Sequence, residues 1–540
     1  MNFLAVHWGV RASAALVCGG RLCGVVSEER FSGIKNDAAF PEKAIAWLLA
    51  HHGLAPSLID GVALCGRRVR MQSVSLKGDV CKQKGWLQQM QAFLAQMGLA
   101  HAKLTVFDWH DCLCYAPIAF SPMKTPCLVV SAGCVGDHAS AQIAAWDGQV
   151  LNVLARLPVS LSWGYFYARA SAFLGFKGVE EDGKVMGLSA YRPRDAFEAV
   201  YARLFQDFVA FDDKDPFGFT FKIDARHMGT YLLDAARALR FDDVAAALQY
   251  AFETFITSWL TRVLKHTGFK HLALNGEVFK NVKLNQKLRA RLPVQSLFFM
   301  PSAGEETSVL GAAFMLARGN LTPVEMLYQG PAFSDEEIAR FLKEHPQKDA
   351  FHARYIDDVD EHVAGLLARG EVVGRFAGAA EFGARSLGHR ALLAHPSQSD
   401  AFYRLNHVIK QRDFWMPFAP AVLDQDAAAY MALPPDFPLT QGGFMIETFA
   451  TTPSGSKALA ACIHPKDGSV RAQIVTPEAD GRFYALIEAF KAKTGIGAVL
   501  NTSLNKHGAP LATNPAQALD VFLETDLRTL ALEHWVLEKI

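Results

Sequence analysis

The sequence predicts an α/β protein that is divided into two domains. Short apolar runs bounded by glycine turns, which are typical of strands and hairpins, occur in two similar sets within the first third of the chain. Longer stretches in which apolar residues recur every three or four positions predict helices between and after these sets. A chain of 540 residues is also too long for one hydrophobic core, because single cores stop growing near roughly 250 to 300 residues.

The two sets of strands have the same order. Three apolar runs separated by glycine-containing turns predict strands at Phe3–Val6, Ala14–Val17 and Leu22–Val26. The second set predicts strands at Cys127–Val130, Ala139–Trp146 and Val150–Leu154, with a glycine-rich turn at 131–137. This repetition indicates a duplicated α/β domain.

Later glycine turns indicate phosphate binding. A helix is expected at Val244–Lys265, and the strand Leu272–Leu274 leads into a glycine turn at 275–281. A second turn at 301–304 opens another helix. Glycine turns that leave a strand and open a helix bring backbone N–H groups and a helix dipole to one place, which suits phosphate.

A second domain follows a polar, proline-containing stretch at 330–350. Beyond it, strands expected at Val372–Phe376 and Ala498–Leu500 alternate with a helix at Arg482–Lys491. The predicted domains are therefore residues 1–340 and 341–540.

The charge composition does not favour nucleic acid or a membrane as a partner. The 54 basic side chains balance the 54 acidic ones, so net charge gives no argument for nucleic acid or a membrane as partner. Neither a signal sequence nor an apolar run of 18 residues is visible, and we expect a cytoplasmic protein. Nine cysteines form no disulfide framework in so long a chain and are expected to be reduced. Only Cys112 and Cys114, close to His110, have a spacing that suggests a ligand cluster.

Nine sequence blocks occur together in the order of one known family. They are residues 12–16 (ASAAL), 28–31 (EERF), 40–41 (FP), 183–188 (GKVMGL), 381–390 (EFGARSLGHR), 409–410 (IK), 417–420 (PFAP), 467–468 (DG) with Arg471, and 501–505 (NTSLN). Across nearly the whole chain the sequence resembles the carbamoyltransferases of the nodulation-protein-U, cephamycin and tobramycin type.

The resemblance implies an N-terminal domain of the actin and sugar-kinase superfold and a C-terminal YrdC-like domain. In this family the YrdC-like domain makes a carbamoyl-adenylate from carbamoyl phosphate and ATP. The N-terminal domain then moves the carbamoyl group to an acceptor hydroxyl. The repeated strand order fits this superfold independently of the resemblance.

The C-terminal site needs fixed cations, because carbamoyl phosphate and a triphosphate repel each other. Five cations are the candidates for binding these substrates: Arg385, Arg390, Lys410, Arg412 and Arg471, of which Arg385, Lys410 and Arg471 are predicted to be catalytic. Arginine binds phosphate with two parallel hydrogen bonds and stays charged. The alternative is that these residues form surface ion pairs.

Three uncharged or weakly basic residues complete this candidate site. Asn501 and Asn505 follow a predicted strand and either bind substrate or form a turn. His464 either meets the carbamoyl group or caps a turn. The family usually has an arginine before Pro-Phe-Ala-Pro, where this chain has Met416, and this departure puts carbamoyl phosphate itself in question as the donor.

The N-terminal site departs further from the family. The residue in the position of the family's base is Val10, which accepts no proton, and His7 is the candidate substitute. The positions of two iron-binding histidines are Trp109 and Leu113, so the iron site is expected to be lost. Glu305 replaces the family's aspartate ligand.

A second metal arrangement stays open at the same place. His110 and Cys114 also stand four residues apart, turned by about 100° around the helix, and such a pair suits zinc better than iron. Glu305 and His110 are therefore the candidate metal ligands.

Nucleotide binding in this domain is predicted from the glycine turns. Ala132 stands where an aspartate is usual, but six candidate residues remain: Gly133, Gly136, Asp137, Lys184, Gly276 and Gly304. Backbone N–H groups hold phosphate without side chains, so ATP, with Mg²⁺ on the nucleotide, is the predicted cofactor.

The predicted function is ATP-dependent carbamoyl transfer to a hydroxyl or amine of a small molecule in specialised metabolism, by a homodimer. One alternative is an adenylating enzyme for a different small acid. The other is a noncatalytic partner protein with a degenerate transferase domain.

Overall fold

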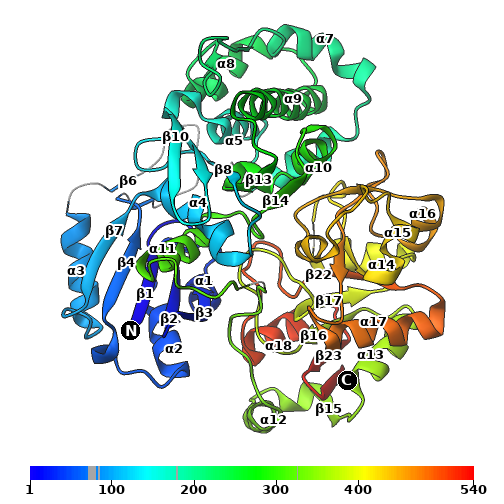
Figure 1. Cartoon of the computed structure of the whole chain (residues 1–540). Coiled ribbons are helices and arrows are strands. Elements are labelled where there is room, and N and C mark those ends of the chain that lie inside the picture. Colours follow the sequence, from blue (N-terminus) through cyan, green and yellow to red (C-terminus); the bar gives the residue numbers. More distant parts are fainter. Residues whose placement is uncertain (68, 71–80, 83–84, 178–180, 325, 411) are drawn as a thin grey trace. The chain divides into compact units, whose positions relative to one another are not determined.

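The computed structural model describes residues 1–67, 69–70, 81–82, 85–177, 181–324, 326–410 and 412–540. The chain divides into two compact units (Figure 1). Unit 1 consists of residues 1–32 and 36–325, and unit 2 consists of residues 33–35 and 326–540. Both are α/β, as the sequence predicts.

Unit 1 is built around two sheets of the same topology. The strand orders are β3-β2-β1-β4-β7 and β10-β9-β8-β13-β14, so each sheet has an antiparallel meander followed by two parallel strands. The first five strands are Asn2–His7 (β1), Ser13–Cys18 (β2), Arg21–Ser27 (β3), Gly61–Cys65 (β4) and Lys103–Phe107 (β7). The second five are Cys127–Ala132 (β8), Ala141–Trp146 (β9), Leu151–Leu157 (β10), His271–Asn275 (β13) and Ser296–Phe299 (β14). The predicted duplication is confirmed.

Helices cover the two sheets of unit 1. Those of the first half are Glu29–Ser32 (α1), Glu42–His51 (α2), Trp86–Gln96 (α3) and Trp109–Phe120 (α4). Those of the second half are Trp163–Phe173 (α5), Asp182–Ser189 (α6), Arg194–Leu204 (α7), Met228–Ala235 (α8), Phe241–Thr267 (α9), Val282–Arg291 (α10) and Ser308–Leu316 (α11). Two small hairpins pair Val69–Arg70 (β5) with Cys81–Lys82 (β6) and Val209–Ala210 (β11) with Thr220–Phe221 (β12).

Helices α4 and α11 pack closely against each other beside the first sheet. Gly311 permits this approach, because a Cβ atom there would collide with the carbonyl group of Cys112. The N-terminus of α4 is fixed by Asp108, whose side chain accepts a 3.0 Å hydrogen bond from the His110 N–H. The packing and the cap together orient the α4 side chains that face the pocket of unit 1.

Unit 2 contains one mixed sheet of eight strands in the order β15-β24-β23-β16-β17-β22-β18-β21. The strands are Phe351–Tyr355 (β15), Val373–Phe376 (β16), Arg390–Ala394 (β17), Ala419–Leu423 (β18), Gln473–Val475 (β21), Ala498–Ser503 (β22), Thr529–Leu532 (β23) and Trp535–Lys539 (β24). A separate hairpin pairs Phe449–Ala450 (β19) with Ser469–Val470 (β20).

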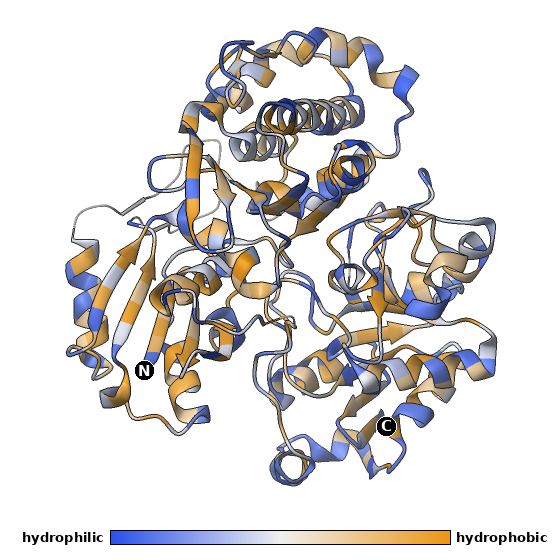
Figure 2. Ribbon diagram, in the orientation of Figure 1, coloured by the Kyte–Doolittle hydropathy of each residue, from blue (hydrophilic) through white to orange (hydrophobic). Residues whose placement is uncertain are grey.

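Both faces of this sheet are buried, and alternate residues of β17 show why. Leu392 belongs to one hydrophobic cluster and Leu393 to the other. The helices of unit 2 are Asp335–Glu344 (α12), Val359–Ala368 (α13), Ser399–Tyr403 (α14), Asp424–Tyr430 (α15), Pro453–Ala458 (α16), Gly481–Thr494 (α17) and Pro515–Glu524 (α18), with a π-helical turn at Arg404–Lys410. Figure 2 shows hydrophobic residues concentrated on the strands and hydrophilic ones along the outer sides of the flanking helices.

None of the helices in the described ranges combines the length and hydropathy of a membrane span. The eight cysteines whose side chains are described form no disulfide bond.

Candidate functional site

Unit 2 gathers four of the predicted cations in one electrostatic cluster. Burial lowers the pKa of Arg471, and the positive charges of Arg385 and Arg412 lower it further. The pKa of Arg412 falls to about 10, again through burial and through Arg385. The pKa of Lys410 is also lowered, by burial and by Arg412. Cations close enough to depress one another's pKa values create a positive potential that attracts anions.

Lys410 is fixed by the end of β22 and the chain that follows it. Its Nζ donates to the carbonyl of Ser503 at 2.5 Å, the Ser503 hydroxyl at 3.1 Å and the Asn505 carbonyl at 3.0 Å, and it also contacts Asn505 Oδ1. The Asn505 side chain in turn donates to the carbonyl of Ala509 at 2.6 Å. Two of the predicted residues, Lys410 and Asn505, are thus brought into direct contact.

Arg390 has a different environment from the other predicted arginines. Its side chain is fully buried and donates to the carbonyl groups of Ala377 and Pro331 at 2.8 Å and of Gly378 at 2.9 Å. The guanidinium carbon lies 3.7 Å from the centre of the Phe376 ring. These contacts join β17 to the loop after β16 and to the segment before α12.

His464 lies in a tight turn of unit 2. Its backbone N–H donates to Ser469 and its carbonyl accepts from Gly468, while Nδ1 lies 3.6 Å from Oδ1 of Asp467. This is the turn-capping arrangement that the sequence leaves open for His464.

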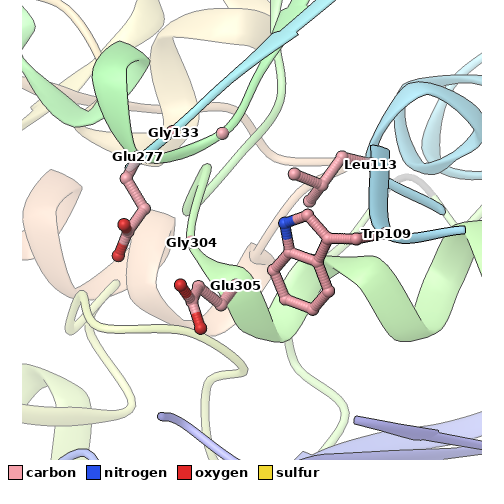
Figure 3. Close-up of a pocket in the computed structure, with 7 residues that line it drawn as sticks. Trp109, Leu113, Gly133, Glu277, Gly304 and Glu305 are labelled. Carbon is pink, nitrogen blue, oxygen red and sulfur yellow. The ribbon is translucent and has the colours of Figure 1, made fainter. Parts of the chain in front are cut away.

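Unit 1 contains a small pocket with about 190 Å³ of empty space, which includes open solvent at its mouth. It is lined by Trp109, Leu113, Gly133, Gly276, Glu277, Gly304 and Glu305. Figure 3 shows the side chains of Trp109 and Leu113 coming from one helix, across from the carboxylates of Glu277 and Glu305. Three of the glycines predicted to bind nucleotide, at 133, 276 and 304, therefore border one cavity.

The turn before Glu305 is strained and holds an internal carboxylate. Ser302 has a φ of 67°, in the left-handed region that non-glycine residues seldom adopt. A Cβ atom on Gly304 would collide with the carboxylate of Glu306, which Ser302 contacts through its hydroxyl. Burial raises the pKa of Glu306, but Arg11 and Lys280 more than offset this, and the pKa lies below its usual value.

The remaining predicted nucleotide residues lie outside the pocket lining. Asp137 accepts hydrogen bonds from the backbone N–H groups of Arg67 at 2.6 Å and Trp109 at 3.1 Å. Gly136 packs against His110, where a Cβ atom would lie 2.5 Å from the imidazole ring. Lys184 forms a 2.8 Å ion pair with Glu181.

The residues around the pocket do not fit an iron site. Trp109 and Leu113, which face Glu305, carry no metal-binding atoms. His110 Nδ1 lies 2.8 Å from the hydroxyl of Ser131, and Nε2 lies 3.0 Å from the carbonyl of Ala139. Cys114 contacts the same Ser131 hydroxyl at 3.4 Å. Within the described part of the chain, no group of three His, Cys, Asp or Glu residues could hold a metal ion.

His7, the candidate base, is buried at the end of β1. Its Nε2 lies 3.0 Å from the carbonyl of Val10 and 3.8 Å from Oε2 of Glu305, and its ring packs 4.9 Å from that of Trp109. A carbonyl group accepts but does not donate, so Nε2 carries a proton in this arrangement. In this tautomer only Nδ1 of His7 could accept a further proton.

Asp182, which the sequence analysis does not single out, is a second candidate base. Burial and the nearby carboxylate of Glu277 raise its pKa to about 8, against the lowering effects of the Ser171 hydroxyl and of the charges of Lys280 and Arg11. Its buried Oδ1 accepts no hydrogen bond from the described residues. The sequence signal for this site is the acidic residue that precedes Gly183 and Lys184 in the GKVMGL block.

Solved structures that match this chain share little sequence with it. Component A of the (R)-2-hydroxyglutaryl-CoA dehydratase of Acidaminococcus fermentans matches with a TM-score of 0.35 and 11% identity, over 59% of this chain and 99% of that one. Full-length HypF matches with a TM-score of 0.34 and 12% identity, over 59% of this chain and 46% of that one. At these TM-scores the similarity carries no inference about this chain.

Sequence relatives cover far more of the chain. Nodulation protein NolNO of Sinorhizobium fredii is 30% identical over 560 aligned residues, which span 98% of this chain and 78% of that protein. Nodulation protein U of Bradyrhizobium diazoefficiens is 25% identical over 94% of this chain and 92% of that protein. An uncharacterised protein of Methanocaldococcus jannaschii is 27% identical over 99% of both.

Two family patterns divide the chain between them. The pattern described as "Carbamoyltransferase N-terminus" matches residues 7–314, and the pattern described as "Carbamoyltransferase C-terminus" matches residues 364–539. These two matches establish carbamoyl transfer as the chemistry of this enzyme. The chain belongs to the carbamoyltransferase family and is a carbamoyltransferase.

Proposed function

We propose that this enzyme activates a carbamoyl group with ATP in unit 2 and transfers it from a carbamoyl-adenylate to a hydroxyl or amine of a small molecule in unit 1. The observation that carries the first half is the cluster of Arg385, Arg412 and Arg471 beside Lys410. Holding like charges together costs stability, and bound polyanions offset that cost.

Activation takes two steps. Carbamoyl phosphate reacts with water to give carbamate and inorganic phosphate, and a carbamate oxygen then attacks the α-phosphorus of ATP. The bond from the α-phosphorus to the bridging oxygen breaks, and pyrophosphate leaves with the electron pair. Arg385, Arg412 and Arg471 would bind the phosphate oxygens. Lys410, which Ser503 and Asn505 hold in place, would neutralise a neighbouring negative charge of the substrates. Mg²⁺ enters the proposal only as the counter-ion of ATP.

The transfer step belongs to the pocket of unit 1. The acceptor oxygen or nitrogen attacks the carbamoyl carbon, the bond from that carbon to the phosphate oxygen breaks, and AMP leaves. The acceptor's proton passes to a base, for which we propose Asp182, with His7 as the second candidate. The turns at Gly133, Gly276 and Gly304 would hold the nucleotide by backbone N–H groups.

The test is pyrophosphate release from ATP. We expect release that requires carbamoyl phosphate and disappears in Arg385→Ala. Release that depends on another small acid instead would support the adenylating alternative. No release with any acid tested would support the noncatalytic alternative and contradict the proposal. The acceptor, which we expect to belong to specialised metabolism, would then be sought by mass spectrometry of carbamoylated products.

A further inference from the structure

A single buried carboxylate holds the turn that carries Arg385. Oε1 of Glu381, a residue only 1% exposed, accepts hydrogen bonds from the backbone N–H groups of Leu387 at 2.8 Å, His389 at 3.0 Å and Arg390 at 3.2 Å. Three N–H groups that converge on one point form an anion-binding nest. Here the nest is filled by the chain's own carboxylate, which fixes the backbone on the C-terminal side of Arg385.

Side chains from outside the turn donate hydrogen bonds to its carbonyl groups. The Leu387 carbonyl accepts from Gln473 Nε2 at 2.7 Å and from the Tyr328 hydroxyl at 3.0 Å. The Gly388 carbonyl accepts from Nη1 of Arg375 at 2.7 Å. Both the N–H and the C=O groups that follow Arg385 therefore have fixed partners.

Asn501 holds the residue next to Arg385. Its Nδ2 donates to the Ser386 carbonyl at 3.3 Å and to Gln473 Oε1 at 2.9 Å, and its Oδ1 lies 3.3 Å from the Ser386 hydroxyl. The side-chain amide of this buried asparagine thus contacts the turn itself and helps to position it.

A fixed turn matters here because Arg385 is repelled by its neighbours. Its charge acts on both Arg412 and Arg471 and lowers their pKa values. A long, partly exposed side chain on a mobile turn would move away from these charges into solvent. A rigid turn keeps Arg385 close to them before any ligand arrives, which reduces the cost of ordering the site when the ligand binds.

We propose that Glu381 is a positioning residue, which holds Arg385 in the cation cluster by filling the nest formed by residues 387, 389 and 390. The proposal rests on the proposed role of unit 2 as the acyl-phosphate and ATP site. Glu381 touches no substrate and acts only through Arg385.

The test is a double-mutant cycle on the binding of pyrophosphate, measured by calorimetry. Glu381→Gln keeps the shape of the side chain but removes its charge, and we expect about a tenfold loss of affinity, because hydrogen bonds to a charged group are roughly twice as strong as neutral ones. In an Arg385→Met background the same substitution should cost less than about twofold, since the residue it positions is gone. The matched control is Glu533→Gln, which removes a buried carboxylate that accepts from the Gly378 N–H at 2.5 Å without touching the turn.

Equal losses in both backgrounds, or no loss in either, would overturn the proposal, and so would a loss with Glu533→Gln of the same size and coupling. If Glu381→Gln does not fold, Asn501→Ala must show the same coupling to Arg385, and additive behaviour of that variant overturns the proposal instead. Pyrophosphate release by the unmodified enzyme is assayed separately. If the unmodified enzyme releases no pyrophosphate, the proposed function is contradicted. The double-mutant cycle on pyrophosphate binding can still be interpreted in that case.

Discussion

Asp182 is a half-buried residue whose carboxyl Oδ1 is enclosed, and its neighbour Glu277 lines the pocket of unit 1. With its pKa at about 8, the group is mostly protonated at pH 7 and gains its charge as the pH rises through 8. For a hydroxyl acceptor we expect the transfer rate to rise up to about pH 8 and then to level off. Asp182→Asn should lower the rate by about 10² to 10⁴ and abolish this pH dependence. A transfer profile unchanged in Asp182→Asn, with a loss in His7→Ala instead, would identify His7 as the base.

The same residue gives a prediction for stability. The pKa of Asp182 is about 8 in the folded chain and near 3.9 in an unfolded one, so the folded chain holds the proton more tightly. The contribution of Asp182 to the free energy of unfolding is complete below about pH 4 and is lost as the pH rises through 8. We expect Asp182→Asn to retain its melting temperature between pH 6 and 9 better than the unmodified enzyme does. A parallel decline of both proteins would contradict the raised pKa.

Arg471 is expected to lower the stability of the enzyme while it contributes to anion binding. Burial and the charges of Arg385 and Arg412 disfavour its cation, so Arg471→Met should melt at the same temperature as the unmodified enzyme or above it. Pyrophosphate at a hundred times its dissociation constant should stabilise the unmodified unit 2 by about 2.7 kcal/mol and the variant far less. Thermal melts with and without pyrophosphate, at matched ionic strength, check this. Arg340→Met, which removes an exposed arginine of α12, is the control and should keep the full ligand effect.

At the scale of elements, the face of helix α4 that meets Glu305 carries no metal-binding side chain. Residues 109 and 113 lie one turn apart and face Glu305, whereas 110 and 114 both meet Ser131 on the neighbouring strand. We therefore expect the purified enzyme to contain much less than one iron per chain, measured by elemental analysis. Trp109→His with Leu113→His should bind a divalent metal, because both imidazoles would then face the carboxylate of Glu305. Stoichiometric iron in the unmodified enzyme would show that other residues supply the ligands.

Many of the strands and helices can be predicted from the sequence, because each is determined largely by residues that are close together in the chain. Apolar alternation and glycine turns identify the duplicated meander, and the regular recurrence of apolar residues identifies α9. The partners of polar side chains are set by tertiary packing. Arg390 donates to three backbone carbonyls and Asn501 holds the Arg385 turn, although their sequence motif is also typical of ligand-binding residues. Asp182 stands in an acidic run that resembles a solvated surface, but in the folded chain it is half-buried near Glu277, Lys280 and Arg11, which are distant in sequence.

At the scale of the whole molecule, the chain consists of two units that each have their own sheet and hydrophobic core. The eight strands of the unit 2 sheet all come from residues 351–539, so no strand is lost when residues 1–325 are removed. A protein consisting of residues 326–540 should therefore fold with one cooperative melting transition. Circular dichroism and calorimetry check this. Two separate transitions would contradict a single folding unit.

Such a protein should also release pyrophosphate with carbamoyl phosphate and ATP, but carbamoylate no acceptor, because Asp182 and the pocket at Glu305 belong to unit 1. It lacks residues 33–35, and the charge of Lys35 acts on Lys410, so we expect its KM for ATP to exceed that of the full chain. Lys35→Met in the full chain removes the same charge and leaves the rest of unit 1 in place. If that variant shows the same KM as the shortened protein, the loss is electrostatic and confined to unit 2. If Lys35→Met has the KM of the unmodified enzyme while the shortened protein is inactive, unit 1 is required for the activation step as well, and the assignment of activation to unit 2 alone is wrong.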